Sequence, residues 1–326
     1  MCIRDRDLGA ELSGKLRLVI VPIKYDTDGS GRTPTVSTAQ LDLYKKTMMR
    51  VYPASEVEVT THAPYPWTTQ IAGNGTGFSS VLRAMTQLRQ RDQADHDVYY
   101  YGLLAPTSSM NTFCQGSCVT GLSTVVEDAD TAVMRASVGI GFPGQDSANT
   151  MAHEVGHAHG REHAPCGGAA STDPSFPYSG GGIGVWGYDI FAKTFLAPTK
   201  GKDMMGYCPN EWVSDYTYNA LFERITTIST EKKVQSAMPG AVASTAPVAA
   251  RYRVATVKMC IRDRVRAPPQ PVPRESSTSS EATTPPMRAT SFMRPIRSTA
   301  HTAAGRAPST RSPENCAISG GHRAVQ

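Results

Sequence analysis

The stretch His153-Glu154-Val155-Gly156-His157-Ala158-His159-Gly160-Arg161-Glu162-His163 matches the pattern H-E-x-x-H-x-x-G-x-x-H at every fixed position. On a helix, residues four apart share one face, so His153 and His157 can present two imidazoles to one zinc ion. Gly160 lets the chain leave the helix, because glycine adopts positive φ at little cost, and His163 then supplies a third ligand. Three protein ligands leave one coordination position open, which is typical of a catalytic zinc site.

Glu154 directly follows the first ligand, where its carboxylate can hold a water molecule at the metal and take its proton. All five fixed positions arise by chance in a chain of this length in roughly one case in ten thousand. The alternatives are a histidine-rich helix without metal and a zinc site that has lost catalysis. The sequence therefore predicts a zinc-dependent hydrolase with Glu154 as general base. The alternative function is a catalytically inactive zinc-containing binding or adhesion module.

These residues resemble the metzincin clan of zinc endopeptidases, whose second mark is a tight turn with a methionine beneath the metal. The matching segment is Asp203-Met204-Met205-Gly206-Tyr207-Cys208, which puts Met205 at the clan's methionine. Tyr207 stands where some metzincin families have a tyrosine that ligates zinc or stabilises the oxyanion; the alternative is a packing aromatic. Residues 184–189 look like the bacterial mucin-cleaving (StcE-like) branch, with the snake-venom (reprolysin) type as the alternative. The resemblance covers about residues 15–227.

The resemblance implies hydrolysis of peptide bonds in a protein or glycoprotein substrate, with one catalytic Zn²⁺. It implies an α/β (α+β) fold: a twisted, mostly parallel sheet with an antiparallel edge strand, the zinc helix below it, and a small C-terminal subdomain ending in a helix. An extended peptide can add to that edge as an extra strand, and residues 120–125 are the candidate edge. The alternative is a covered sheet edge that binds no ligand.

The hydrophobic pattern agrees with this order of elements. Alternating or continuous apolar runs rich in β-branched and aromatic residues predict strands, and apolar residues at helical spacing predict helices. The expected strands are 15–25, 57–60, 97–104, 121–126 and 136–142, and the expected helices are 38–52 and 78–93. The zinc helix is expected to start near Ser147 or Asn149, and a last helix to run from a cap at Ser214 through Ile228.

Four cysteines remain once those of a repeated hexamer and of the C-terminal tail are set aside: Cys114, Cys118, Cys166 and Cys208. Their even number predicts disulfides and an oxidising location, either secreted and extracellular or periplasmic. In the metzincin resemblance, the segments after the third ligand and after the Met-turn meet beneath the zinc. That implies Cys166–Cys208 and leaves Cys114 with Cys118. A second zinc site is the alternative.

The hexamer Met1–Arg6 recurs letter for letter as Met259–Arg264, without matching flanks. It looks like translated adapter sequence, so we set residues 1–6 aside; a coincidental or functional short repeat is the alternative. Residues 259–326 contain ten Arg and no Lys, Leu, Tyr or Trp, so we expect an artefactual or disordered tail. The catalytic domain is then expected at 7–238 and a linker at 239–258.

Charge and hydropathy give no support to other partners. The tail holds ten basic and four acidic residues, a net charge of +6, which exceeds the +5 of the whole chain. The rest of the chain therefore carries a net charge of −1, and nucleic-acid binding has no basis in the domain. No run of eighteen apolar residues is present, so no membrane span is expected.

Asp26–Gly31 begins like a calcium loop, but its twelfth position is Ser37, and calcium is only a weak possibility. No signal peptide is visible; any propeptide would lie before residue 7. The oligomeric state is left open.

Overall fold

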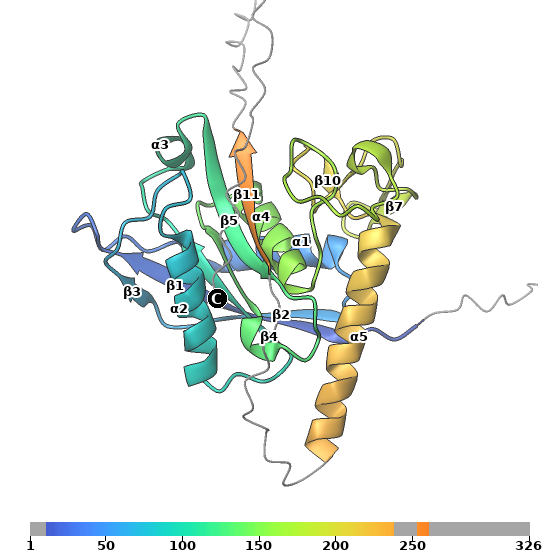
Figure 1. Ribbon diagram of the computed structural model, residues 1–326, viewed down its shortest axis with the longest axis horizontal. Helices are drawn as coiled ribbons and strands as arrows, with labels where there is room; N and C mark the ends of the chain where they lie inside the picture. The colour runs from blue at the N-terminus through green and yellow to red at the C-terminus, as the bar shows by residue number, and fades with distance from the viewer. Residues whose placement is uncertain (1–10, 238–252, 261–326) are drawn as a thin grey trace, which may run out of the picture. The chain divides into compact units, whose positions relative to one another are not determined.

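The computed structural model of the protein describes residues 11–237 and 253–260. Its centre is a seven-stranded sheet in the order β11-β5-β6-β4-β1-β2, with β3 paired to β1 (Figure 1). These strands are β1 (Lys15–Tyr25), β2 (Glu56–Thr61), β3 (Tyr65–Trp67), β4 (Val98–Leu104), β5 (Ser117–Val125), β6 (Ala136–Ile140) and β11 (Arg253–Cys260).

Five helices accompany the sheet: α1 (Thr38–Val51), α2 (Phe78–Arg91), α3 (Met110–Cys114), α4 (Gln145–Ala158) and α5 (Asp215–Ala237). Between α4 and α5 lie two small ribbons, β7 (Gly187–Asp189) with β8 (Thr194–Leu196), and β9 (Lys202–Asp203) with β10 (Glu211–Trp212). Short 3₁₀ turns occur at Ala132–Met134 and Ser179–Gly181. No helix within these described ranges is both long and apolar enough to cross a bilayer.

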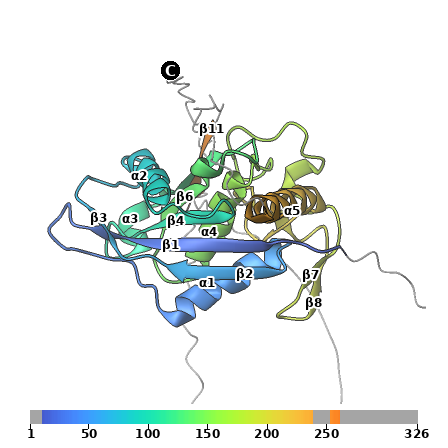
Figure 2. The same ribbon diagram turned by 90° about the horizontal axis from the view of Figure 1, so that it is seen from below.

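The sheet confirms the predicted fold class. β1 runs parallel to β2 and β4, and β4 parallel to β6, while β5 is antiparallel to β6. Every residue of β4 is buried, as expected for a central parallel strand covered on both faces. Figure 2 shows α1 and α2 on opposite sides of the sheet.

Each face of the sheet has its own apolar core, because side chains alternate along a strand. On one face Leu18 and Tyr101 pack with Val155 of α4 and with residues of α1 and α5. On the other face Val21 and Val138 pack with residues of α2 and α3. The zinc-motif helix therefore rests on one face of the sheet, directly over β5 and β6.

Two helix ends differ from the expectation. α4 begins at Gln145, ahead of both expected caps, with Gly144 in the cap position. The hydroxyl of Ser147 cannot cap the helix, because it bonds the carbonyl of Ile140 (3.0 Å) and lies 2.7 Å from the Tyr44 hydroxyl. At α5 the expected cap is present: Ser214 Oγ accepts from the backbone N–H of Thr217 at 3.0 Å. The helix continues past Ile228 to Ala237.

Residues 253–260 differ from the expected linker and tail, since they form β11. This strand pairs antiparallel with β5 from Arg253↔Val125 to Cys260↔Ser117. The physical reason is that β5 would otherwise present unpaired backbone N–H and C=O groups, which bind any extended segment within reach. The expected adapter segment 1–6, residues 238–252 and residues 261–326 lie outside the described residues.

Candidate metal centre

The histidine motif starts on α4 and leaves it through a glycine turn. Gly160 has φ +85°, and the N–H of Arg161 donates to the carbonyl of Gly156 (3.0 Å), while the N–H of Gly160 donates to that of His157 (2.8 Å). These two bonds form a Schellman motif, which requires a left-handed residue after the helix. The turn carries the chain back so that His163 faces the two helical histidines.

The three histidines converge through one nitrogen each. His153 Nε2 lies 3.0 Å from His157 Nε2, which lies 3.2 Å from His163 Nε2. Three nitrogens that share a tetrahedral zinc at 2.0–2.1 Å would lie about 3.3 Å apart. The donor set and its spacing therefore fit one zinc ion. Within the described ranges, these three residues are the one group of three or more His, Cys, Asp or Glu side chains gathered closely enough to hold a metal.

The opposite nitrogen of each ring points at a backbone carbonyl. His153 Nδ1 lies 2.7 Å from Met204 O, His157 Nδ1 2.6 Å from Arg161 O, and His163 Nδ1 2.5 Å from Ala170 O. A carbonyl only accepts, so each Nδ1 carries the proton and each Nε2 keeps its lone pair for a metal. The three carbonyls come from three different segments, which fixes all three ring orientations at once.

Burial also keeps the ligands neutral. It lowers the pKa of His153 to about 3, with the neighbouring His163 adding to the shift, and lowers the pKa of His157 well below its usual value. Burial lowers the pKa of His163 as well. A metal competes with protons for these nitrogens, so neutral imidazoles are ready to bind it.

Glu154 is fully buried, and neither of its carboxylate oxygens has a hydrogen-bond partner among the described residues. Burial raises the pKa of Glu154 well above its usual value. The Glu154 carboxylate fits against β5 because Gly121 has no side chain. A Cβ added to Gly121 would lie 2.3 Å from Glu154 Oε1. The role of Gly121 was not predicted from the sequence. The signal was available, because an isolated glycine inside a strand often marks a close approach.

The turn that contains Met205 packs against α4. Met205 is fully buried, and its sulfur lies against Gly156, between the two helical ligands in sequence. Asp203 holds the turn, since its carboxylate accepts from the N–H groups of Met205 (2.9 Å) and Ser214 (2.8 Å). The role of Asp203 was not predicted from the sequence, because its partners become neighbours only in the folded turn.

Tyr207 reaches the metal centre from the same turn. Its hydroxyl lies 3.0 Å from His163 Nε2, and its ring centroid lies 5.0 Å from that of His163. The phenol oxygen thus stands beside the nitrogen that would face the metal. This position allows either ligation or donation to a substrate oxygen.

Two disulfides lie in the described part of the chain, Cys166–Cys208 and Cys114–Cys118. Cys166–Cys208 ties the segment that follows His163 to the end of the Met-turn. The backbone reinforces this link, because the N–H of Tyr207 donates to the carbonyl of Cys166 at 3.0 Å.

Other polar residues of the sequence motifs serve the scaffold. His159 is buried and stacks on Tyr99 with ring centroids 4.2 Å apart, away from the ligand cluster. In the weak calcium loop, Asp28 pairs with Arg32 (2.5 Å) and Asp26 accepts from the N–H of Gly31 (2.8 Å). These carboxylates are used within the turn.

Comparison with known proteins gives one partial family match. Residues 133–254, less than half of the chain, match the family model described as Peptidase M66. No curated protein matches the chain. The solved structures with similarity include metalloproteinase-II from Bacteroides fragilis, at 13% identity and a TM-score of 0.35, covering 69% of this chain and 57% of that one. Another is described as a chaperone–substrate complex, at 14% identity and a TM-score of 0.34, covering 67% of this chain and 35% of that one.

This chain thus spans somewhat over half of the Bacteroides metalloproteinase and about a third of the chain from the chaperone–substrate complex. At such low TM-scores, neither match bears on the function of this chain. The family match is more informative, because it includes α4, the third ligand, the Met-turn and Tyr207. The buried three-histidine centre and the match to a peptidase family over the same residues support a metalloprotease.

Proposed function

We propose that the protein is a zinc endopeptidase of the metzincin type that cleaves protein or glycoprotein substrates. The observation that carries the proposal is the convergence of three Nε2 atoms, together with a buried glutamate that directly follows His153 on the same helix. Residues 184–189 favour the bacterial mucin-cleaving branch within that clan. The two disulfides fit an oxidising location, so we propose a secreted or periplasmic protein.

His153, His157 and His163 would hold the zinc ion, which supplies Lewis-acid activation of water and of the scissile carbonyl. The Glu154 carboxylate takes a proton from the attacking water and delivers it to the departing amine nitrogen. The Tyr207 hydroxyl donates to the carbonyl oxygen as negative charge develops there.

The substrate chain is proposed to lie along β5. The pairing of β11 with this strand supports the idea, because β5 forms an antiparallel ladder with an extended segment, and Val257 of β11 is the partner of Gly121. Gly121 adjoins Glu154, so a strand in this place passes beside the general base. Since β11 covers the edge, a substrate strand would have to replace it.

The test is zinc content and casein cleavage by the full chain, with Glu154→Gln and Glu223→Gln alongside. Glu223 is an exposed carboxylate on α5 and serves as the matched control. The proposal expects one zinc per chain in all three proteins and cleavage lost in Glu154→Gln alone. A parent that binds zinc without cleaving would favour the inactive binding module, and a folded parent without zinc would refute the metal centre.

A further inference from the structure

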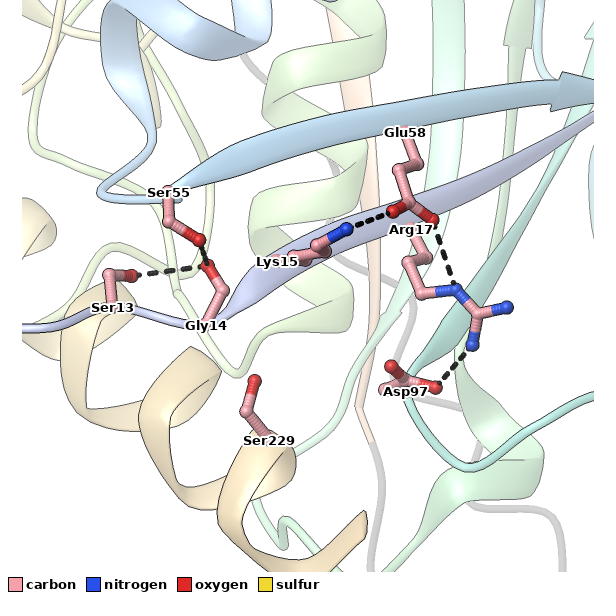
Figure 3. A pocket seen from close by; sticks show the side chains of 8 residues that line it. All are labelled: Ser13, Gly14, Lys15, Arg17, Ser55, Glu58, Asp97 and Ser229. Atoms are coloured by element: carbon pink, nitrogen blue, oxygen red, sulfur yellow. Dashed lines mark hydrogen bonds and ion pairs between the residues drawn. The ribbon is translucent and has the colours of Figure 1, made fainter. Parts of the chain in front are cut away.

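Two cavities differ in how their charges are compensated. The first, about 520 Å³, lies at the start of β1 (Figure 3). Its charged groups pair with one another: Lys15 bonds Glu58 at 2.7 Å, and Arg17 bonds Asp97 at 2.8 Å. Because these charges are already paired with one another, this cavity offers no unpaired charge to a charged ligand.

The second cavity, about 240 Å³, lies between α1, α4 and the segment from Met204 to Trp212. We call it the Glu211 pocket. Its volume suits one long side chain and is below the usual size of a site for a whole small molecule. Trp212 forms an aromatic wall, and on α4 the Gln145 amide donates to Asn149 Oδ1 at 2.7 Å, which fixes the polar side.

The carboxylate of Glu211 has no ion-pair or hydrogen-bond partner among the described residues. Lys202, its neighbour across the β9–β10 ribbon, instead donates its ammonium to the carbonyl of Gly180 at 2.8 Å. Glu211 as a residue is exposed at the rim of the pocket, but partial desolvation of its carboxyl group, with repulsion from Asp146, raises the pKa of Glu211 to about 7. Both influences would be relieved by a cation placed beside Glu211.

Arg50, the cationic residue that lines the pocket, does not neutralise Glu211. Arg50 pairs with Asp189 at 3.2 Å, and its guanidinium lies over the ring of Phe191, 5.7 Å from the centroid. The charge of Arg50 is thus balanced within the protein. Among the residues that line the pocket, the charge left without a partner in the described part of the chain is negative and belongs to Glu211.

The pocket lies close to the metal centre. Asn149, which lines it, precedes His153 by four residues on α4, so the two share a face one turn apart, about 5.4 Å. Met204 also lines it, and its carbonyl accepts from His153 Nδ1. Two residues of an extended peptide advance about 6.6 Å, which exceeds one helical turn, so the spacing along α4 allows a substrate side chain within two residues of the bond under attack to reach the pocket.

We propose that the Glu211 pocket binds a lysine or arginine side chain of the substrate, within two residues of the scissile bond; this inference rests on the proposed endopeptidase function. The aliphatic stem lies along Trp212, where a cation also gains from the aromatic face. The charged head pairs with the Glu211 carboxylate.

The first experiment is cleavage of a denatured protein mixture by the full chain, with the products sequenced by mass spectrometry. We expect lysine and arginine to be enriched at least fivefold at one position near the cleaved bond. For two peptides that differ only in lysine or norleucine there, Glu211→Gln should lower kcat/KM on the lysine peptide about tenfold and change the norleucine value less than twofold. Glu223→Gln should change neither. Absence of the preference, or a preference that survives Glu211→Gln, overturns the proposal.

The second experiment separates the pocket from the chemistry. Nα-acetyl-lysine amide is titrated into the full-chain Glu154→Gln variant while the Trp212 indole N–H signal is followed by NMR. A saturable shift that disappears in Glu154→Gln/Glu211→Gln supports the pocket even if the parent cleaves nothing, in which case the proposed function alone fails. Cleavage without preference, together with no saturable shift, refutes the pocket and leaves the endopeptidase in place.

Discussion

Gly121→Ala should inactivate the enzyme without removing its metal. A Cβ at this position would lie 2.3 Å from Glu154 Oε1, 2.6 Å from its Cγ and 2.7 Å from its Cδ. These distances are shorter than van der Waals contacts, so either the carboxylate or β5 must move. Gly121 does not have a positive φ, so alanine meets no backbone strain there and the effect comes from contact alone.

The size of the effect follows from the overlap. Ordinary contact with a Cβ begins near 3.4 Å, so the carboxylate must retreat by about 1 Å. A misplacement of about 1 Å in a reacting group costs roughly 100-fold in rate. Overpacking of this kind also costs about 1–3 kcal/mol of stability. The three histidines proposed to hold zinc lie elsewhere in the chain, so zinc content should stay at the parent value.

The assay is kcat/KM on a fluorogenic peptide, with zinc content and the free energy of unfolding measured on the same samples. Ser123→Ala is the control, because Ser123 lies two residues further along β5 on the same face and its hydroxyl bonds Ser137 at 2.9 Å. It should lose some stability but retain kcat/KM within about threefold. A Gly121→Ala protein that cleaves within about twofold of the parent at full zinc content would refute the argument.

Three further changes probe the same region. Tyr207→Phe keeps the ring beside His163 but removes the hydroxyl at 3.0 Å, so zinc content should hold and kcat fall about 100-fold; an unchanged kcat would assign Tyr207 to packing. Replacing Cys166 and Cys208 by serine opens a loop that the disulfide closes at a separation of 42 residues. Chemical denaturation should show that the free energy of unfolding falls by about 4 kcal/mol, and a fall of less than about 1 kcal/mol would contradict this loop-closure argument. Glu211→Gln should stabilise the protein by about 1 kcal/mol at pH 8 and not at pH 4, measured by urea unfolding. The folded-state pKa of about 7 lies above the unfolded value of 4.5, so stability is lost as pH rises through that window; solvent access reduces the size. Equal effects at both pH values would show that ionisation is not the cause.

The sequence was most informative where a local pattern determines the structure. The spacing of His153 and His157 on one helix and the turn at Gly160 depend on neighbours within one or two helical turns. The buried run of β4 and the cap at Ser214 are local in the same sense. Such features could be predicted, since hydrophobic period and capping act over a few residues.

The parts that could not be predicted depend on contacts between distant segments. Ser147 would make a good cap, but a hydrogen bond to Ile140 and contact with Tyr44 of α1 occupy its hydroxyl. β11 forms because β5 offers an edge, and nothing in residues 253–260 alone specifies that partner. In the sequence Glu211 resembles any other surface acid. Only the fold shows that Lys202, its neighbour across the β9–β10 ribbon, donates its ammonium to the carbonyl of Gly180 instead of to Glu211.

The metal centre depends on both kinds of information. Its three imidazoles were identifiable from spacing, but the carbonyls that orient them belong to Met204, Arg161 and Ala170. All three lie between α4 and α5, and Ala170 and Met204 lie inside the loop that Cys166–Cys208 closes. The ligand geometry is therefore coupled to the docking of that segment on α4. Since a metal that binds only the docked form stabilises it, the segment and the site should form together. Asp203 holds the Met-turn through the N–H groups of Met205 and Ser214, so we expect it to contribute to metal affinity without contacting the ion.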